Sequence, residues 1–189
     1  MFNVPIDGVT PELRRQVKAM SYGLVYGLSA FGLSQQLGIP AGEAKQIMES
    51  YFERFVGVQP YLREIVEEAR KAGYTETLFG RRRYLPELTS DNRVARENAE
   101  RAALNAPIQG TAADIIKVAM IRVDRSLKEA AVKSRVLLQV HDELVVEVAA
   151  GELEQVREIL EREMDNAIKL SVPLEVSAGD GVNWDAAAH

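Results

Sequence analysis

The sequence contains no cysteine, which excludes disulfide bonds, thiolate zinc sites and cysteine nucleophiles. It contains two histidines, so a bound metal ion would be held by oxygen atoms or by these side chains. No apolar run approaches the ~18 residues that span a bilayer, and the first residues lack the basic-then-apolar pattern of a secretory signal. We therefore expect a cytoplasmic protein with no membrane partner.

Positive charge is also scarce, because 23 lysines and arginines stand against 28 acidic residues and the net charge is −5. Bulk electrostatics therefore does not indicate a nucleic-acid partner, as a strongly basic domain would. Two local basic clusters stand out, one at Arg14, Arg15 and Lys18 and one at residues 81–83. Much of the acidic excess lies in residues 152–163, which are typical of a solvated helix face.

Apolar periodicity and helix-end signals predict a largely helical first part. Thr10 and Pro11 mark the start of the first helix, which should end at about Tyr26 before Gly27. Further helices are predicted over residues 29–37, 40–57, 60–73, 91–131 and 152–170. The long helix at 91–131 contains Pro107 and Gly110, where we expect a break or kink.

Segments rich in β-branched residues predict two hairpins and a last strand. The first hairpin covers residues 74–85 with its turn at Phe79 and Gly80, and the second covers residues 136–148. A final strand is predicted over residues 172–178. The fold class is therefore α+β, with a helical part followed by a small antiparallel sheet packed on helices.

Four side chains recur at every fourth position of the predicted first helix and so lie along one gently spiralling face: Arg14, Lys18, Tyr22 and Tyr26. Such a face suits a nucleoside triphosphate, because cations neutralise phosphates and an aromatic ring packs on the sugar or base. An exposed basic helix with buried tyrosines would show the same spacing. The stripe alone is compatible with both interpretations.

Two carboxylates, Asp142 and Glu143, follow His141 between the strands of the second predicted hairpin. Rigid strands would hold them while leaving them open to solvent, which suits a hard divalent cation such as Mg²⁺. Equally, Asp142 is a common turn residue and Glu143 a solvated charge. Both interpretations stay open from these residues alone.

A third series at spacing four lies on the predicted long helix: Arg101, Asn105 and Gln109. Guanidinium and amide groups can bond the minor-groove acceptors that every base pair presents, and so test base-pair shape without reading sequence. A polar, solvent-facing stripe would have the same pattern. The arginines at 81–83 could likewise contact phosphates or only keep a hairpin soluble.

Taken together, three segments resemble family A DNA polymerases, most closely the bacterial polymerase I group. Residues 14–27 (RRQVKAMSYGLVYG) are similar to the family's motif B, and residues 137–143 (LLQVHDE) are similar to motif C. Between them, residues 100–117 (ERAALNAPIQGTAADIIK) resemble the long palm helix. Their order and spacing agree with the family, and the likeness extends to the terminal residues 183–185.

The resemblance implies part of the fingers at residues 1–92 and part of the palm at residues 93–189. It assigns Arg14 and Lys18 to the triphosphate, Tyr22 to the sugar and Tyr26 to the neighbourhood of the templating base. By the same analogy Asp142 is a metal ligand, Glu143 lies close to the metals, and His141 contacts the primer end. It also implies that Arg101, Asn105 and Gln109 lie along the minor groove at the nascent base pair.

The reaction that the resemblance implies is addition of deoxynucleoside triphosphates to the 3′-hydroxyl of primer-template DNA, with two Mg²⁺ ions. In the family, a second carboxylate comes from motif A, which precedes motif B. This sequence has no counterpart of motif A, of the thumb or of the exonuclease domains. We therefore expect a fragment with little or no activity alone, whose uncovered sheet edge and apolar surface favour self-association.

Tyr22 carries a finer expectation, because in the resembling family tyrosine at this position goes with readier acceptance of dideoxynucleotides. The alternative to an enzyme fragment is a non-catalytic module that binds DNA or nucleotides and has lost catalysis. The match at positions 14, 18, 101, 105, 109 and 142 argues against such decay. A structural protein with a fortuitous stripe would require all three motifs to coincide by chance.

Overall fold

The computed structural model describes residue 5 and residues 8–187. Helices dominate, and the described residues contain two small sheets, each made of two antiparallel strands. The expected α+β class is therefore confirmed. The chain divides into two compact units, residues 1–108 and residues 109–189, and each is described separately below. The assignment of fingers and palm to residues 1–92 and 93–189 stays a prediction.

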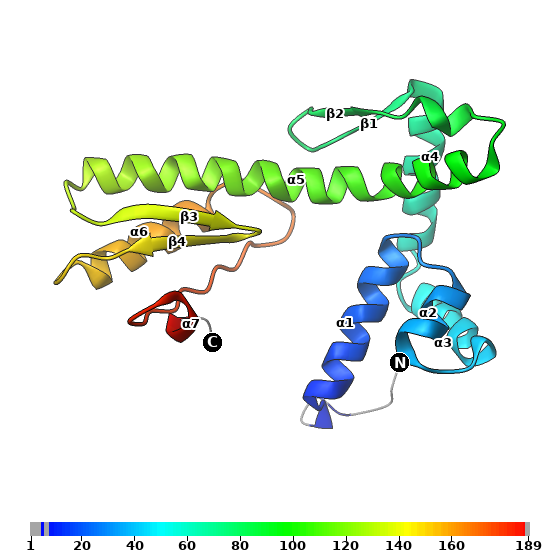
Figure 1. The fold of residues 1–189 in the computed structure, drawn as a ribbon, viewed down its shortest axis with the longest axis horizontal. Coiled ribbons are helices and arrows are strands. Elements are labelled where there is room, and N and C mark those ends of the chain that lie inside the picture. The colour runs from blue at the N-terminus through cyan, green and yellow to red at the C-terminus, as the bar shows by residue number, and fades with distance from the viewer. Residues whose placement is uncertain (1–4, 6–7, 188–189) are drawn as a thin grey trace. The chain divides into compact units, whose positions relative to one another are not determined.

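Four helices open the first unit in the order expected from the sequence (Figure 1). Their bounds are α1 (Pro11–Val25), α2 (Ala30–Leu37), α3 (Ala41–Arg54) and α4 (Val58–Ala72). The start of α4 corrects the prediction, because the helix begins before Pro60 rather than after it. A proline is tolerated in a first turn, where its missing N–H would have no intrahelical partner.

The first two helices begin at side-chain caps. The Leu13 amide donates to Oγ1 of Thr10 at 3.2 Å, and the Gly32 amide donates to Oγ of Ser29 at 3.1 Å. Each bond satisfies one of the amides that a helix start leaves without a partner. The predicted starts of both helices are thus confirmed.

Two apolar clusters hold the first unit together. The first joins α1, α2 and α3 through buried side chains: Met20, Leu24, Leu33, Ala44 and Tyr51. The second joins α4 to the segment that follows it and to the start of α5, again through buried side chains: Ala69, Leu85, Leu88, Ala99 and Ala103. The sequence periodicity of α1 and α3 thus has its expected cause, one apolar face packed in a core.

A short hairpin of β1 (Tyr74–Glu76) and β2 (Arg82–Tyr84) follows α4 and leads into a 3₁₀ turn, η2 (Pro86–Thr89). Arg82 Nε bonds Glu76 Oε2 at 2.8 Å, and its guanidinium lies 4.4 Å from the ring centre of Tyr74. The Glu76 carboxylate also raises the pKa of Arg82. One arginine of the predicted basic cluster therefore stabilises the hairpin itself.

The long helix α5 (Arg93–Glu129) is a single helix with Pro107 inside it. The helix is continuous through Pro107 and Gly110, so the predicted break at these residues is wrong, whereas the predicted kink stays a prediction. Proline removes its own hydrogen bond to the carbonyl four residues earlier, but tertiary packing supplies most of a helix's stability. Buried side chains lie on α5 both before and after this point: Ala99, Ala103, Ile116 and Ala119.

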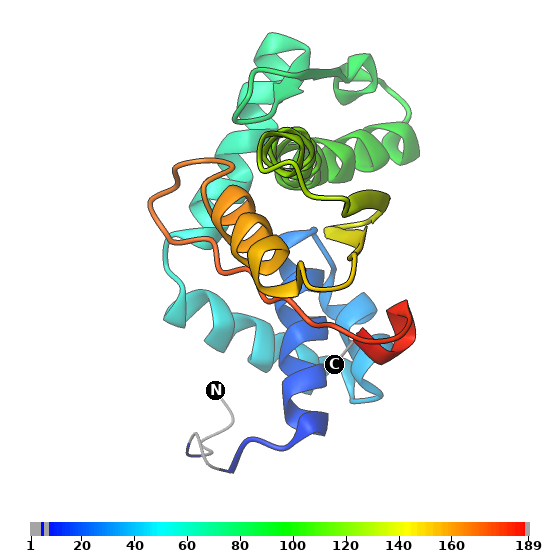
Figure 2. The same ribbon diagram turned by 90° about the vertical axis from the view of Figure 1, so that its left-hand side faces the viewer.

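The second unit holds β3 (Arg135–Val140), β4 (Glu143–Glu147), α6 (Leu153–Asp165) and α7 (Trp184–Ala187). The β3–β4 hairpin and α6 both lie along the C-terminal half of α5, as Figures 1 and 2 show from two directions. Buried residues of α5 and α6 form the core between them: Val123, Leu127, Val156 and Ile159. Val136, Leu144 and Val146 of the hairpin pack against this core.

Two predictions near the C-terminus are wrong. The helix at α6 ends at Asp165 instead of residue 170, and residues 172–178 form no strand. A strand needs a neighbour for its backbone groups, and the sheet formed by the described residues of this unit stops at two strands. The Val176 amide donates to Oδ1 of Asp165 at 3.1 Å instead. Among the described helices, none is long and apolar enough to cross a membrane.

Candidate nucleotide and metal site

The cation-aromatic stripe lies along α1 as the spacing predicts. Arg14 and Lys18 are exposed on this helix, and Tyr22 follows one turn later with 53% of its surface exposed. Tyr26 is the C-cap residue, and its amide donates to the carbonyl of Tyr22 at 3.0 Å. The tyrosines are therefore not both core residues, and the alternative of a basic helix with buried tyrosines is wrong for Tyr22.

The last three members of the stripe contact one another in sequence. The ammonium nitrogen of Lys18 lies 5.8 Å from the ring centre of Tyr22, within the range of a cation–π contact. The rings of Tyr22 and Tyr26 have centres 6.3 Å apart and planes inclined by 14°. The helix thus presents charge at one end and two nearly parallel ring faces at the other, which matches the layout of a triphosphate joined to a sugar and base.

The end of α1 is built by a glycine turn. Gly27 has φ +78°, a conformation that costs glycine no steric strain, and a methyl group at Gly27 would lie 3.1 Å from Cδ1 of Leu104 on α5. The chain therefore approaches α5 closely at this point. An open pocket forms here, lined by residues of the turn and of α5: Gly23, Tyr26, Gly27, Leu28, Ser29 and Arg101.

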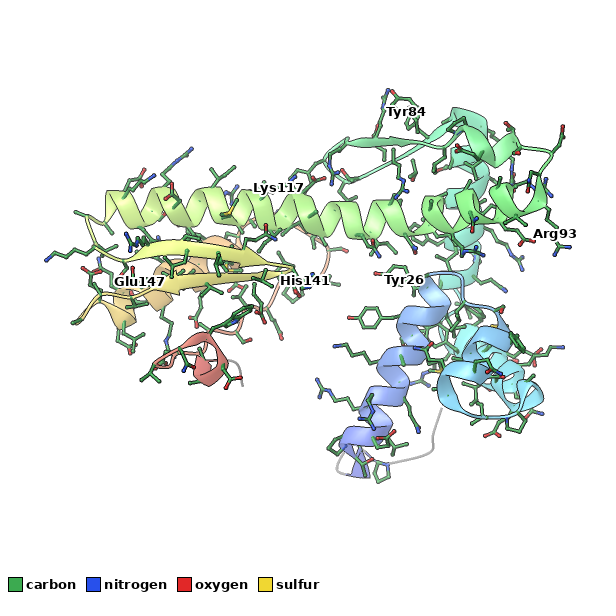
Figure 3. The ribbon with its side chains drawn as sticks, in the orientation of Figure 1. Tyr26, Tyr84, Arg93, Lys117, His141 and Glu147 are labelled. Carbon is green, nitrogen blue, oxygen red and sulfur yellow. The ribbon has the colours of Figure 1, made fainter. Side chains whose placement is uncertain are left out.

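This pocket unites Tyr26 with Arg101, which the sequence analysis treated as members of separate series. Figure 3 shows Tyr26 at the C-terminal end of α1. The sequence indicated the meeting of Tyr26 and Arg101 only indirectly. Glycines at 23, 27 and 32 permit close approach of the backbone, but spacing alone does not say what approaches it.

The polar series of α5 has three different environments. Arg101 is exposed and donates to Oδ1 of Asn98. Asn105 is half-buried, and its Oδ1 is enclosed and accepts no hydrogen bond from any described residue. Gln109 is exposed and belongs to the second unit. An enclosed acceptor without a donor is costly, so Asn105 is the member whose environment most indicates an external or water donor.

The carboxylates predicted for metal binding lie at the end of the β3–β4 hairpin. His141 and Asp142 form its two-residue turn, with His141 at φ +53°, and Figure 3 shows His141 at this tip, with Glu147 at the other end of the hairpin. Gln139 Nε2 donates to the His141 carbonyl at 2.7 Å and thereby steadies the turn. Glu143 is not a turn residue, because it begins β4 and pairs with Val140.

Asp142 and Glu143 are both exposed and offer the oxygen atoms that hard cations prefer. Within the part of the chain that the structure describes, no three His, Asp or Glu side chains are grouped closely enough to hold a metal ion. Asp142 therefore fits the role of a single protein ligand. The remaining ligands would have to be water, substrate oxygens or another carboxylate.

The sequence profile of DNA polymerase family A matches residues 1–186. The chain therefore belongs to the family A DNA polymerases. Among curated relatives, it is 67% identical over 188 residues to DNA polymerase I of Mycobacterium bovis, a match that covers 100% of this chain and 21% of that protein. It is 50% identical to DNA polymerase I of Pseudomonas aeruginosa over 187 residues, which are 99% of this chain and 20% of that protein.

A solved structure agrees over the whole chain. The polymerase domain of Pol1 from M. smegmatis, in complex with DNA primer-template and dNTP, superposes with a TM-score of 0.96 and 66% identity. This match covers 100% of this chain and 33% of the solved chain. The chain thus spans a fifth to a third of the proteins that it matches, and the predicted resemblance to family A is confirmed.

Proposed function

We propose that this chain forms the nucleotide-binding part of a DNA-directed DNA polymerase, which adds deoxynucleotides to a primer 3′-hydroxyl on a DNA template. The observation that carries the proposal is the stripe on α1, in which Lys18 contacts Tyr22 and Tyr22 contacts Tyr26. The bound DNA primer-template and dNTP of the M. smegmatis structure support it, because that structure matches this chain over its full length.

Within this proposal, Arg14 and Lys18 bind the triphosphate. The guanidinium of Arg14 can bond two phosphate oxygens at once, whereas the ammonium of Lys18 acts as a compact charge. The ammonium of Lys18 also donates hydrogen bonds to the oxygens on which negative charge grows as pyrophosphate leaves. Tyr22 packs on the sugar, and Tyr26 lies beside the templating base.

Asp142 would hold Mg²⁺, of which the complete enzyme would use two, with Glu143 nearby and His141 at the primer end. When bound, these ions supply the charge that activates a hydroxyl and stabilises a leaving phosphate. The paired strands keep the Asp142 carboxylate in place while it stays exposed. A site on rigid elements loses less free energy to ordering than one on a long loop.

The α5 series would contact the minor groove of the nascent base pair. The guanidinium of Arg101 and the amides of Asn105 and Gln109 can donate to acceptors that every Watson–Crick pair presents. The enclosed Oδ1 of Asn105 has no donor among the described residues, which is costly, so we propose that binding of DNA brings a donor to it. An ordered water molecule between the side chain and the DNA would be such a donor.

We further propose that the isolated chain is inactive or nearly so, because the described residues contain no group of three His, Asp or Glu side chains that could by itself hold a metal ion. A module that binds DNA or nucleotides without catalysis is the alternative.

Self-association is a separate prediction, supported by Leu137 and Leu138 on β3, which are 49% and 52% exposed. Light scattering that shows a monomer at high concentration would contradict it. The cytoplasmic location also stays a prediction.

Primer extension with Mg²⁺ and four deoxynucleotides tests the proposal. The isolated chain is compared with a chimera in which it replaces the matching residues of the M. smegmatis polymerase domain. We expect extension by the chimera alone, abolished by chelation of Mg²⁺ and by Asp142→Asn. Glu154→Gln, which neutralises an exposed carboxylate on α6, is the matched control. An inactive chimera that binds primer-template DNA would favour the non-catalytic module.

A further inference from the structure

The side chain of Leu28 lies between two glycines that belong to different helices. A methyl group at Gly23 of α1 would lie 2.6 Å from Cδ2 of Leu28 and 3.4 Å from its Cβ. A methyl group at Gly32 of α2 would lie 2.6 Å from Cδ1 and 3.1 Å from Cγ of the same leucine. Carbon atoms at van der Waals contact are ~3.5–4.0 Å apart. The two absent methyl groups thus define a notch that Leu28 fills, here called the glycine notch.

The backbone of Leu28 is fixed at the same place. Its amide donates to the carbonyl of Gly23 at 2.7 Å. Because this bond returns to α1 and the side chain reaches α2, Leu28 joins the end of one helix to the start of the next. Only four residues separate these helices, from Tyr26 to Ser29, so a shift of Leu28 has little intervening chain to absorb it.

Tyr26 and Gly27 lie between two fixed points. On one side, the Tyr26 amide is bonded to the Tyr22 carbonyl at 3.0 Å. On the other side, Leu28 is held in the glycine notch. Gly27 also lies close to α5, because a methyl group on it would be 3.1 Å from Cδ1 of Leu104. A displacement of Leu28 that reaches its Cγ and Cβ would therefore also shift the backbone of Tyr26 and Gly27, two residues that line the pocket with Arg101.

We infer that Leu28 is a positioning residue, which sets the place of Tyr26 opposite Arg101 through its fit between Gly23 and Gly32. The inference rests on the proposed role of Tyr26 beside the templating base. Leu28 needs no contact with the nucleotide for this role. Its effect is on the geometry of the residue that makes the contact, and a displacement of ~1 Å at such a residue can cost up to ~100-fold in rate.

The test fills and empties the notch in the active chimera described above. Gly32→Ala adds a methyl group that forces Leu28 to move, and Leu28→Ala removes the side chain that fills the notch. The double variant restores part of the volume, because the new methyl group of residue 32 occupies space left by the leucine. Gly42→Ala is the matched control, since Gly42 also lies in a first helical turn but a methyl group there meets nothing within 4 Å.

We expect kcat/KM for the correct nucleotide to fall at least about tenfold in each single variant. The double variant should recover to within about threefold of the parent chimera, and the control should stay within about twofold. Affinity for primer-template DNA should change less than about twofold in all four. Unchanged kcat/KM in Gly32→Ala, or a double variant worse than both single variants, overturns the inference.

A second measurement keeps the inference separate from the proposed function. Amide hydrogen exchange of the isolated 189-residue chain reports on the Leu28 and Tyr26 amides directly. Gly32→Ala should speed exchange at both amides by at least about tenfold, with recovery in the double variant and no change in Gly42→Ala. If the chimera fails to extend primers but exchange behaves as expected, the polymerase proposal fails and the positioning of Tyr26 by Leu28 stands. Exchange that is unaffected in Gly32→Ala refutes that positioning.

Discussion

The rings of Tyr22 and Tyr26 lie one helical turn apart and nearly parallel, with centres separated by 6.3 Å and planes inclined by 14°. Lys18, one turn before Tyr22, approaches the same ring, with its nitrogen 5.8 Å from the ring centre. Tyr22 thus contacts one residue a turn before it and another a turn after it, although 53% of its surface is exposed. Its hydroxyl is therefore presented by a ring with limited freedom.

Replacing Tyr22 by phenylalanine in the chimera should lower the ratio of dideoxynucleotide to deoxynucleotide incorporation by about fivefold or more. The hydroxyl would otherwise replace a hydrogen bond that the missing 3′-hydroxyl cannot make, and such a bond contributes ~1 kcal/mol. Competition between the two nucleotides in primer extension measures the ratio. Tyr61→Phe on α4, where the tyrosine is 52% exposed, is the control. Equal ratios in parent and Tyr22→Phe would refute this role of the hydroxyl.

Replacing Thr10 by alanine should reduce the free energy of unfolding by ~1 kcal/mol, because the Leu13 amide loses its capping acceptor. Urea denaturation followed by circular dichroism measures the change. Thr10→Ser keeps the hydroxyl and should retain most of the stability. If serine and alanine are equally destabilising, the cap is not the cause.

Replacing Leu33 by alanine should cost about 2–5 kcal/mol, because this side chain is fully buried between α1, α2 and α3. Phe31 lies on the same helix but is 68% exposed, so Phe31→Ala should change the free energy of unfolding by less than about 0.5 kcal/mol. Thermal denaturation of both variants compares a core and a surface position of one helix. A similar loss in both variants would argue against the packing of α2.

Glu152 should make stability depend on pH. Its carboxylate accepts bonds from the Lys133 and Ser134 amides at 3.0 Å and from the Ser134 hydroxyl at 2.6 Å. The amide of Lys133, followed by the Ser134 hydroxyl, lowers the pKa of Glu152 below its ordinary value of 4.5. Because the folded-state pKa is depressed, the stabilisation is present above pH 4.5 and is lost as pH falls through the folded-state value.

The stability difference between the parent chain and Glu152→Gln should therefore be largest near neutral pH and shrink steadily below pH 4.5. Urea denaturation from pH 7 to pH 3 measures it. Glu154→Gln in the first turn of α6 is the control, and its difference from the parent should be small throughout. A gap between Glu152→Gln and the parent that stays constant with pH would show that the charge is not responsible.

The sequence predicted those parts of the site that depend on neighbouring residues. Thr10 and Ser29 cap their helices through bonds that reach three residues along the chain. The stripe on α1 needs only helical geometry, which repeats every 3.6 residues. Motif spacing similarly placed Asp142 at a hairpin turn, because the flanking β-branched segments pair with each other. Short-range rules suffice for such features.

Predictions that needed knowledge of distant packing were the ones that failed. Pro107 carries a strong local signal against helix, yet α5 continues because buried residues on both sides of it are packed. Residues 172–178 have the composition of a strand, but the only sheet among the described residues of this unit consists of β3 and β4, with which they do not pair. In both cases the free energy of tertiary contacts, or their absence, outweighs local preference.

By itself, the amino-acid sequence determined the family, the starts of the first two helices, the two hairpins and the identity of the side chains that carry charge and aromatic surface. Only the tertiary structure decided which of them meet. Tyr26 shares a pocket with Arg101, and Leu28 fits between Gly23 and Gly32, because the turn after α1 packs closely against both α2 and α5. The reason is physical: periodicity specifies a face of one helix, whereas steric fit depends on what other elements bring to that face.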